Sequence, residues 1–521
     1  MKKKVFLVVL CLSVIWGIWA GGKAETAGGP VAIEAWAYPA VTEASAPPPD
    51  WKVTQAMKEK INIDFKLSLL PSAMNDWDVK LNAAGAANSL PDIFEIRREP
   101  WVKLVNVGLI APVDDLYALM PNRTKLMYGR ESKAFTTLNG KSYGLASPGA
   151  IPKKEGILIR KDWLDKLGLQ VPVTIDDYMN VMRAFTFNDP DGNGKQDTWG
   201  YGAFIEIYPY EEGLGRRFDP FFGAYGVAGT WNMTKANAGL NVRKSAYYDA
   251  LAFVKKMVDE KVIDPNWISY KKDDFRAAWK QGRFGIMRED GAAFGAENNY
   301  APFDKNFPNG SWIVIDPPKG PKGDLAVGAQ VDNWYLLAVS ANAIKQGKGP
   351  AIAKMLEWLS SDEGYYLTGW GEKGINYMTD ANGVPTDVGL PDPNKFFAKS
   401  DIVPITQLRR WVYYQGDVEL LARYPTYKAA TSGKTMSALT VIRNMQKSPW
   451  VDSGGAETLS VPNADLVRFY EQGVIEFLTG QGGRVLTPQN WAAWVADFDK
   501  LGGAAWEKSG IAEAEAQGYL K

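Results

Sequence analysis

The chain has 521 residues, and its 59 Lys and Arg are balanced by 59 Asp and Glu, so its formal net charge is zero. Because there is no basic surplus, we exclude a polyanion-binding protein that works by releasing counterions. Hydrophobic residues make up 46% and charged residues 23% of the chain, a composition typical of globular rather than disordered proteins. At this length we expect roughly two to four domains.

Two absences narrow the possible chemistry. The chain contains no histidine, which excludes Ser-His-Asp and Cys-His nucleophiles and histidine zinc sites. Its single cysteine, Cys11, lies in the leader, so a processed protein would carry no thiol and no disulfide. The chain is instead rich in aromatic residues, with 20 Trp, 23 Tyr and 21 Phe, which supply flat apolar surfaces for binding.

Residues 1–24 have the pattern of a secretory signal peptide. Three lysines follow Met1, residues 5–19 form an apolar run, and small residues continue to Ala24. The alternative is an uncleaved N-terminal anchor, although this run is short for a membrane span. Cys11 lies within the apolar run and is preceded by large residues, so we do not expect a lipoprotein. We expect an exported protein that is periplasmic or on the cell surface.

Strands and helices alternate along the chain beyond residue 30. We expect strands over 31–38, 63–69, 92–96, 155–160 and 282–287, and helices over 51–60, 77–87, 161–167, 246–261, 273–281 and 351–360. Thr174, followed by two aspartates, is expected to cap a further helix. Trp77 lies on an amphipathic helix and is expected in the core. Because helices separate strands, the sequence predicts an α/β fold with a mainly parallel sheet.

The sharpest local motif is the acidic loop Asp189–Gly200. Oxygen-bearing side chains stand at loop positions one, three, five and nine, and a glycine at position six allows a sharp turn. The sequence therefore predicts one structural Ca²⁺ ion, held by Asp189, Asp191, Asn193, Lys195 (through its carbonyl) and Asp197. Position twelve is Gly200 where a bidentate Glu is expected, so Thr198 or water would supply the remaining oxygens. The alternative is a solvated turn without metal.

Other motifs for chemistry are weak. The GxGxxG sequence at 369–374 follows a helix and not a strand, so we do not expect a dinucleotide site. Paired carboxylates for glycoside cleavage need only Asp and Glu, and therefore remain open.

Several short segments carry a family resemblance through their order along the chain. They are SLPDI at 89–93, GKSYGL at 140–145, ILIRKDWLDKLG at 157–168, the acidic loop, GRFGIM at 282–287, DNW at 332–334 and WLSSDEGYYLTGWGEKGINY at 358–377. With them the chain resembles the family-1 extracellular solute-binding proteins of ABC importers. More narrowly, it resembles the calcium-containing group of lipoprotein-type sugar-binding and alginate-oligosaccharide-binding proteins.

The resemblance implies a two-lobed periplasmic-binding-protein fold of the type II kind, with a ligand cleft between the lobes and interleaved crossing segments. We place the N-terminal lobe approximately at residues 30–150 plus 325–400, and the C-terminal lobe at 151–324 plus 401–521. The resemblance further implies a monomer that captures an oligosaccharide, closes on it and delivers it to a membrane permease without catalysis.

Sugars present apolar C–H faces, which aromatic rings cover, and hydroxyl rims, which polar and charged groups bind. Residues of these kinds at strand ends and in loops are therefore the expected ligand contacts: Trp36, Tyr38, Arg97, Asp332, Trp334, Trp370, Glu372, Arg410 and Trp411. If the pair Arg97-Arg98 faces the cleft, the expected ligand is an acidic sugar. The alternatives are a secreted polysaccharide-degrading enzyme with paired carboxylates and a binding module for peptides or lipid-like solutes.

Overall fold

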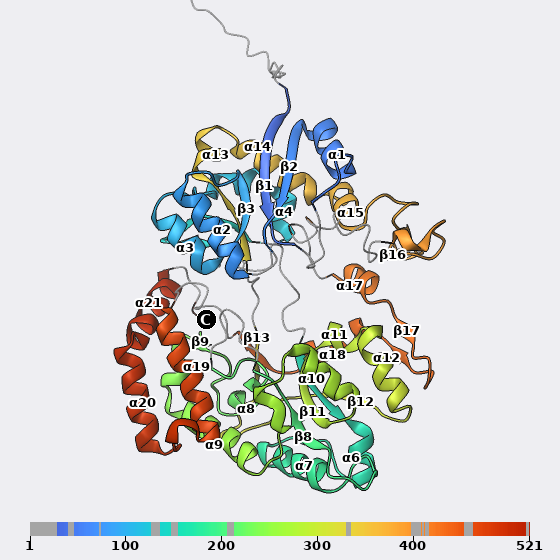
Figure 1. Ribbon diagram of the computed structural model, residues 1–521, viewed down its shortest axis with the longest axis vertical. Coiled ribbons are helices and arrows are strands. Elements are labelled where there is room, and N and C mark those ends of the chain that lie inside the picture. Colours follow the sequence, from blue (N-terminus) through green and yellow to red (C-terminus); the bar gives the residue numbers. More distant parts are fainter. Residues whose placement is uncertain are drawn as a thin grey trace, which may run out of the picture.

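The computed structural model describes residues 29–39, 46–71, 74–126, 136–146, 155–205, 213–329, 335–396, 408, 411, 416–452, 462–516 and 520. Figure 1 shows two lobes, one above the other. We call the lobe built on the first strands the N-lobe and the other the C-lobe. The expected leader, residues 1–24, lies outside the described residues. Among the helices that are described, none has the length and apolar character needed to cross a membrane.

The N-lobe is built on a five-stranded sheet in the order β2-β1-β3-β14-β6. Its strands are β1 (Val31–Ala37), β2 (Ile63–Leu69), β3 (Ile93–Arg97), β6 (Leu145–Ala146) and β14 (Tyr335–Val339). Strands β1, β2 and β3 are parallel, whereas β14 runs antiparallel to both of its neighbours. The expectation of a mainly parallel sheet therefore holds for the first three strands only. The reason is that β14 follows a crossing from the other lobe and enters the sheet from the opposite end.

Both faces of the N-lobe sheet are covered, because successive side chains of a strand point to opposite faces. Leu336 and Ala338 of β14 pack in one cluster, with Trp77 and Trp101, whereas Leu337 and Val339 pack in a second one. The first face is covered by α2 (Met74–Ala86) and α3 (Arg98–Asn106), and the second by α1 (Lys52–Ile61), α14 (Gly349–Leu359) and α15 (Asp362–Trp370). The indole of Trp77 is fully buried, which confirms its prediction as a core residue.

The C-lobe contains a four-stranded sheet in the order β12-β7-β11-β8. Its strands are β7 (Glu155–Arg160), β8 (Trp199–Gly202), β11 (Phe284–Asp290) and β12 (Trp312–Ile315). Strand β7 is antiparallel to β11 and β12, and only β8 and β11 are parallel. Around this sheet lie α6 (Lys161–Leu167), α7 (Ile175–Phe187), α8 (Asp219–Gly223), α9 (Ser245–Asp259), α10 (Lys272–Lys280), α11 (Gly291–Gly295), α12 (Glu297–Asn306) and α18 (Ala438–Lys447).

The end of the chain forms three helices on one side of the C-lobe, coloured red in Figure 1: α19 (Ala464–Thr479), α20 (Pro488–Lys500) and α21 (Gly503–Ala516). Their aromatic side chains, among them Trp491 and Trp494, join the main C-lobe core. Leu408 and Trp411 pack instead in the N-lobe core, although they follow residue 400.

Local sequence signals account for the helix starts. The side chain of Thr174 accepts a hydrogen bond from the amide of Asp177 at 3.1 Å, and the Asp177 carboxylate accepts in return from the Thr174 amide at 2.9 Å. This reciprocal capping satisfies amide groups that have no partner within the helix. The predicted cap at Thr174 is confirmed.

Candidate ligand cleft and the elements that line it

In each lobe, the strand ends next to the crossing between the lobes form one edge of the sheet. In the N-lobe, Tyr335 lies opposite Arg97, so the start of β14 shares an edge with the ends of β1, β3 and β6. In the C-lobe, Glu155 pairs with Asp290, so the start of β7 and the end of β11 share an edge. In the chain only residues 147–154 separate the end of β6 from the start of β7, a reach of at most about 30 Å. The two edges are therefore the ones between which the chain passes from the N-lobe to the C-lobe.

Two of the predicted contact residues lie at the end of β1. Trp36 is half-buried, and the ammonium group of Lys80 lies 4.4 Å from its ring centroid, so one face of the indole is already covered. Tyr38 is also half-buried and stacks on Trp77, with ring centroids 5.1 Å apart. Arg97 at the end of β3 forms an ion pair with Asp78 of α2. These three residues lie at or next to the ends of β1 and β3, and each is already held by a neighbour.

The buried carboxylate of Glu95 organises this end of the sheet. It accepts a hydrogen bond from the indole nitrogen of Trp411 at 2.8 Å and another from the backbone amide of Tyr38. Trp411 itself is fully buried, and its carbonyl oxygen accepts a hydrogen bond from Arg123. Contrary to our expectation, Trp411 is thus a core residue of the N-lobe and offers no exposed ring face to a ligand.

Trp370 also differs from the prediction. It is the last residue of α15 and only 1% exposed, packed among the residues of the second N-lobe cluster, so it is a core residue and not a platform for a sugar. Glu372 follows in a turn that Asn376 closes by accepting from the Glu372 amide at 2.9 Å, and its side chain is half-buried. Asp332, Trp334 and Arg410 lie outside the described residues.

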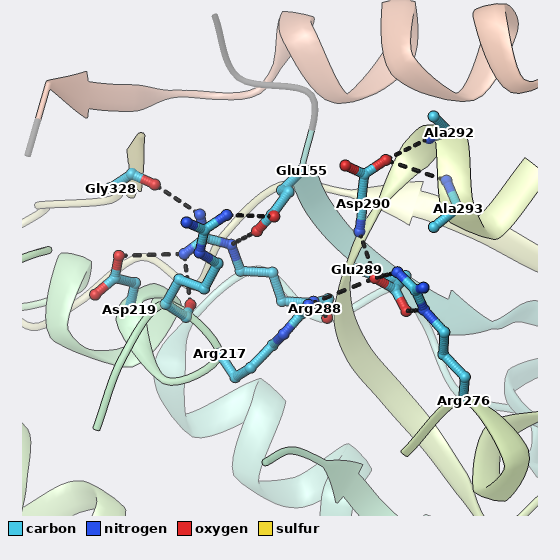
Figure 2. A network of polar contacts seen from close by, with 11 residues as sticks. Glu155, Arg217, Asp219, Arg276, Arg288, Glu289, Asp290, Ala292, Ala293 and Gly328 are labelled. Carbon is cyan, nitrogen blue, oxygen red and sulfur yellow. Dashed lines mark hydrogen bonds and ion pairs between the residues drawn. The ribbon is translucent and has the colours of Figure 1, made fainter. Parts of the chain in front are cut away.

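The C-lobe edge carries a network of buried charges that the sequence reasoning missed (Figure 2). Its centre is Arg288 of β11, whose side chain is 3% exposed. The guanidinium donates to Asp219 at 3.2 Å and to the carbonyl oxygen of Gly328 at 2.6 Å, and lies 3.6 Å from Glu155. One cation therefore ties together strands β7 and β11, helix α8 and strand β13 (Val327–Ala329), which leads toward the N-lobe.

Further arginines complete the network around the acidic residues. Arg216 donates to Glu155 at 2.6 Å, and Arg276 donates to Glu289 at 3.1 Å. Arg217 donates to the carbonyl oxygen of Arg288 and reaches Glu289 at 3.5 Å. The sequence contained a signal for this network, because the charged triplet Arg288-Glu289-Asp290 ends an otherwise apolar strand. Charges in a buried strand require partners.

Burial and ion pairing act in opposite directions on the carboxyl groups of this network. Burial by itself would raise the pKa of Glu155, but the guanidinium groups of Arg216, Arg217 and Arg288 outweigh it and hold the pKa well below its ordinary value. For Asp219 the order is reversed, because burial raises its pKa and Arg288 offsets only part of the rise. The two carboxylates therefore depend on the same arginine to different extents.

The acidic loop of the C-lobe has its side chains drawn together. The Asp189 carboxylate accepts from the amides of Gly192, Asn193 and Gly194 at 3.0–3.1 Å. The side-chain nitrogen of Asn193 lies between two further carboxylates, at 2.8 Å from Asp191 and 3.2 Å from Asp197. Within the described part of the chain, no three acidic side chains are grouped closely enough to hold a metal ion as they stand.

Two details of this loop bear on its expected ligands. Thr198 is 2% exposed and donates to the carbonyl oxygen of Phe185 at 2.9 Å, so its hydroxyl is turned into the C-lobe core rather than toward the loop. Burial and the adjacent carboxylates of Asp189 and Asp197 raise the pKa of Asp191. For Asp189, burial alone would raise the pKa, but hydrogen bonds from loop amides outweigh it and lower the pKa.

A comparison with known protein families decides the class of this molecule. Residues 34–366 match the family described as bacterial extracellular solute-binding protein. The chain belongs to this family. Members of the family bind solutes for transport, so this assignment supports a binding protein and not the alternative of a polysaccharide-degrading enzyme.

Individual relatives of this solute-binding protein agree with the assignment. It is 26% identical over 394 residues to the polygalacturonan/rhamnogalacturonan-binding protein YtcQ of Bacillus subtilis (strain 168), a match covering 72% of this chain and 74% of the relative. Among solved structures, an HMO-binding, ABC-transporter-associated solute-binding protein from Bifidobacterium longum infantis ATCC 15697 is similar, with a TM-score of 0.70 and 16% identity. That match covers 95% of this chain and all 100% of the other.

A second solved structure is the EF-hand mutant of the substrate-binding protein FusA from S. pneumoniae, in complex with fructo-nystose. It matches with a TM-score of 0.63 and 17% identity over 94% of this chain and 98% of the other. At this identity the likeness shows the fold alone. It confirms the predicted two-lobed α/β architecture of the solute-binding protein.

Proposed function

We propose that this protein is an exported receptor that captures an oligosaccharide between its lobes and delivers it to the permease of an ABC importer. The observation that carries the proposal is a two-lobed chain of a solute-binding family, in which the chain passes from one lobe to the other between two sheet edges. Strand ends that meet at a crevice are where α/β proteins bind ligands. A ligand that contacts both lobes would favour the closed arrangement over the open one.

Oligosaccharides are proposed as the ligand class because the name of YtcQ gives polygalacturonan and rhamnogalacturonan as what it binds, and the FusA structure is a complex with fructo-nystose. Export is supported by the family's extracellular character and by the signal-like residues 1–24. The monomeric state stays an expectation.

Isothermal titration calorimetry with trigalacturonate, a rhamnogalacturonan tetrasaccharide and kestose tests the proposal. We expect a binding isotherm with at least one of them, and an unchanged sugar after prolonged incubation. New reducing ends after incubation would instead indicate an enzyme. A flat isotherm with every sugar, together with binding of peptides or lipid-like solutes in a thermal-shift panel, would contradict the oligosaccharide assignment.

We further propose that the acidic loop holds a structural Ca²⁺ ion. The donor set suits a hard cation, because Ca²⁺ prefers oxygen ligands. The carboxylates of Asp191 and Asp197 already lie close together, since both accept from the side-chain nitrogen of Asn193. Binding would require Asn193 to turn its carboxamide oxygen, which now accepts from the Lys195 amide at 2.7 Å, toward the carboxylates. With Thr198 engaged elsewhere and Gly200 at position twelve, water would fill the remaining positions. The FusA structure is described as an EF-hand mutant, which is consistent with a site of this kind in a similar fold.

Calcium binding is tested by melting the protein with and without a chelator. We expect chelation to lower the melting temperature, because an ion that binds only the folded chain stabilises it. Asp191→Ala should abolish the difference, and Asp165→Ala, which removes an exposed carboxylate outside the loop, should preserve it. An identical melting temperature for the wild-type protein with and without chelator would refute the site.

A further inference from the structure

A cavity of about 340 Å³ opens in the C-lobe beside the crossing strand β13. It is lined by residues from three segments: the stretch 223–234, the loop 324–326, and β19 (Trp450–Asp452), which pairs in parallel with β13. Figure 1 shows β9 (Trp231–Asn232) and β13 on the side of the C-lobe that is turned toward the N-lobe. The volume is at the lower end of the range for small-molecule sites, which leaves room for part of an oligosaccharide.

The walls of this cavity are fixed by contacts that leave little freedom. A Cβ atom on Gly223 would lie 1.8 Å from the carbonyl oxygen of Ala326, so the end of α8 presses directly against the loop 324–326. Asp219 accepts from the Gly229 amide at 3.1 Å. The buried side chain of Asn241 donates to the carbonyl oxygens of residues 228 and 229, both at 2.9 Å. A preformed cavity of this kind binds without a large ordering cost.

Two tryptophans give the cavity its aromatic character. Trp450 is 37% exposed, which is unusual for so large an apolar side chain, and its backbone is held opposite Val327. Trp231 is 1% exposed and packs edge-to-face on Trp506, with ring centroids 5.4 Å apart. Its indole nitrogen has no hydrogen-bond acceptor among the described residues. Trp231 therefore forms a rigid aromatic wall of the cavity, and Trp450 is the ring with a face open to an occupant.

The polar groups of the cavity define the charge of its occupant. Asp324 is the only charged residue in the lining; its side chain is exposed at the cavity and its carboxylate lies against Gly226. The side-chain oxygen of Asn232 already accepts from the amide and the hydroxyl of Thr234. A lone carboxylate accepts hydrogen bonds from hydroxyl groups and repels a second carboxylate.

We propose that this cavity is a subsite for a neutral sugar unit, whose apolar face lies on Trp450 and whose hydroxyl groups donate to Asp324. The inference rests on the proposed oligosaccharide function and refines it. The carboxylate of Asp324 disfavours an acidic unit of the same oligosaccharide at this position. The apolar remainder of the lining, including Ala228, Met233 and Val451, favours a unit with few polar groups, such as a deoxyhexose.

The direct test is fluorine NMR of the protein labelled with 5-fluorotryptophan, because it reports on single indole rings. The resonance of Trp450 is assigned from Trp450→Phe. We expect it to shift on titration with the neutral probe methyl α-L-rhamnopyranoside and not with sodium galacturonate. Trp312, half-exposed on the edge strand β12, serves as the control resonance and should not move. No shift with the neutral probe, or an equal shift with galacturonate, overturns the inference.

A second arm separates this inference from the proposed function. Against any oligosaccharide that the wild-type protein binds, Trp450→Ala should weaken affinity about tenfold, because a buried aromatic contact is a typical hot spot. Asp324→Asn should weaken it by a similar factor and should admit galacturonate in the NMR titration. If the wild-type protein binds an oligosaccharide and both variants bind it with the same affinity, the subsite is refuted but the proposed function is not. A Trp450 shift in a protein that binds no oligosaccharide refutes the function and leaves the subsite standing.

Discussion

Replacing Arg288 by methionine should destabilise the C-lobe strongly and in a pH-dependent way. The side chain is 3% exposed and is shared by Glu155, Asp219 and the carbonyl oxygen of Gly328. Methionine preserves much of the volume but leaves two buried carboxylates without this cation. Breaking a buried ion pair by removing one partner costs about 3–5 kcal/mol. For a lobe of this size, that corresponds to a fall of roughly 10 °C in melting temperature.

The pH dependence follows from the direction of the pKa shifts. The pKa of Asp219 is already raised by burial, and the pKa of Glu155 is held low by arginines that include Arg288. In the variant the pKa of Asp219 rises further above its value in the unfolded chain, whereas Arg216 and Arg217 still lower the pKa of Glu155, so folding takes up a proton at Asp219. Stability of the variant is then lost as pH rises through the folded-state pKa of Asp219, and regained in acid. The deficit relative to the wild-type protein should therefore be smaller at about pH 5 than at neutral pH.

Differential scanning calorimetry at the two pH values measures both effects. Arg443→Met is the matched control, because Arg443 pairs with Asp417 at the surface, where an ion pair contributes at most about 1 kcal/mol. If Arg288→Met melts like the wild-type protein, or shows the same deficit at both pH values, the assigned role of Arg288 is wrong.

Three further variants test other parts of the structure by thermal melting. Gly223→Ala should cost about 1–3 kcal/mol, because its Cβ would lie 1.8 Å from a backbone oxygen, whereas Gly29→Ala, with no atom within 4 Å, should be neutral. Glu95→Ala should cost about 1–3 kcal/mol by leaving the Trp411 indole N–H unpaired, and Glu59→Ala, at an exposed position, should not. Burial raises the pKa of Glu471 to about 7, so wild-type stability should fall between about pH 5 and pH 8. Glu471→Gln should flatten that slope, and an unchanged slope would contradict the assignment.

Local patterns in the sequence were enough to place several of the longer helices and strands. The cap at Thr174 joins residues three positions apart, and the turn of the acidic loop is closed by hydrogen bonds within five residues of Asp189. The strand 63–69 and the helix 161–167 have the predicted bounds. Such features depend on neighbouring residues alone, so the sequence by itself determines them.

Burial at the candidate cleft was decided by tertiary packing. We expected Trp370 and Trp411 to contact a ligand, yet Trp370 ends α15 and both side chains are covered by N-lobe elements far away along the chain. The charge network likewise exists only because β7 and β11 pair in one register, which places Glu155 opposite Asp290 and next to Arg288. The local sequence of either strand alone does not determine that register. The sequence therefore determined the elements, the acidic loop and the family resemblance, and only the tertiary structure decided which aromatic and charged side chains remain available to a ligand.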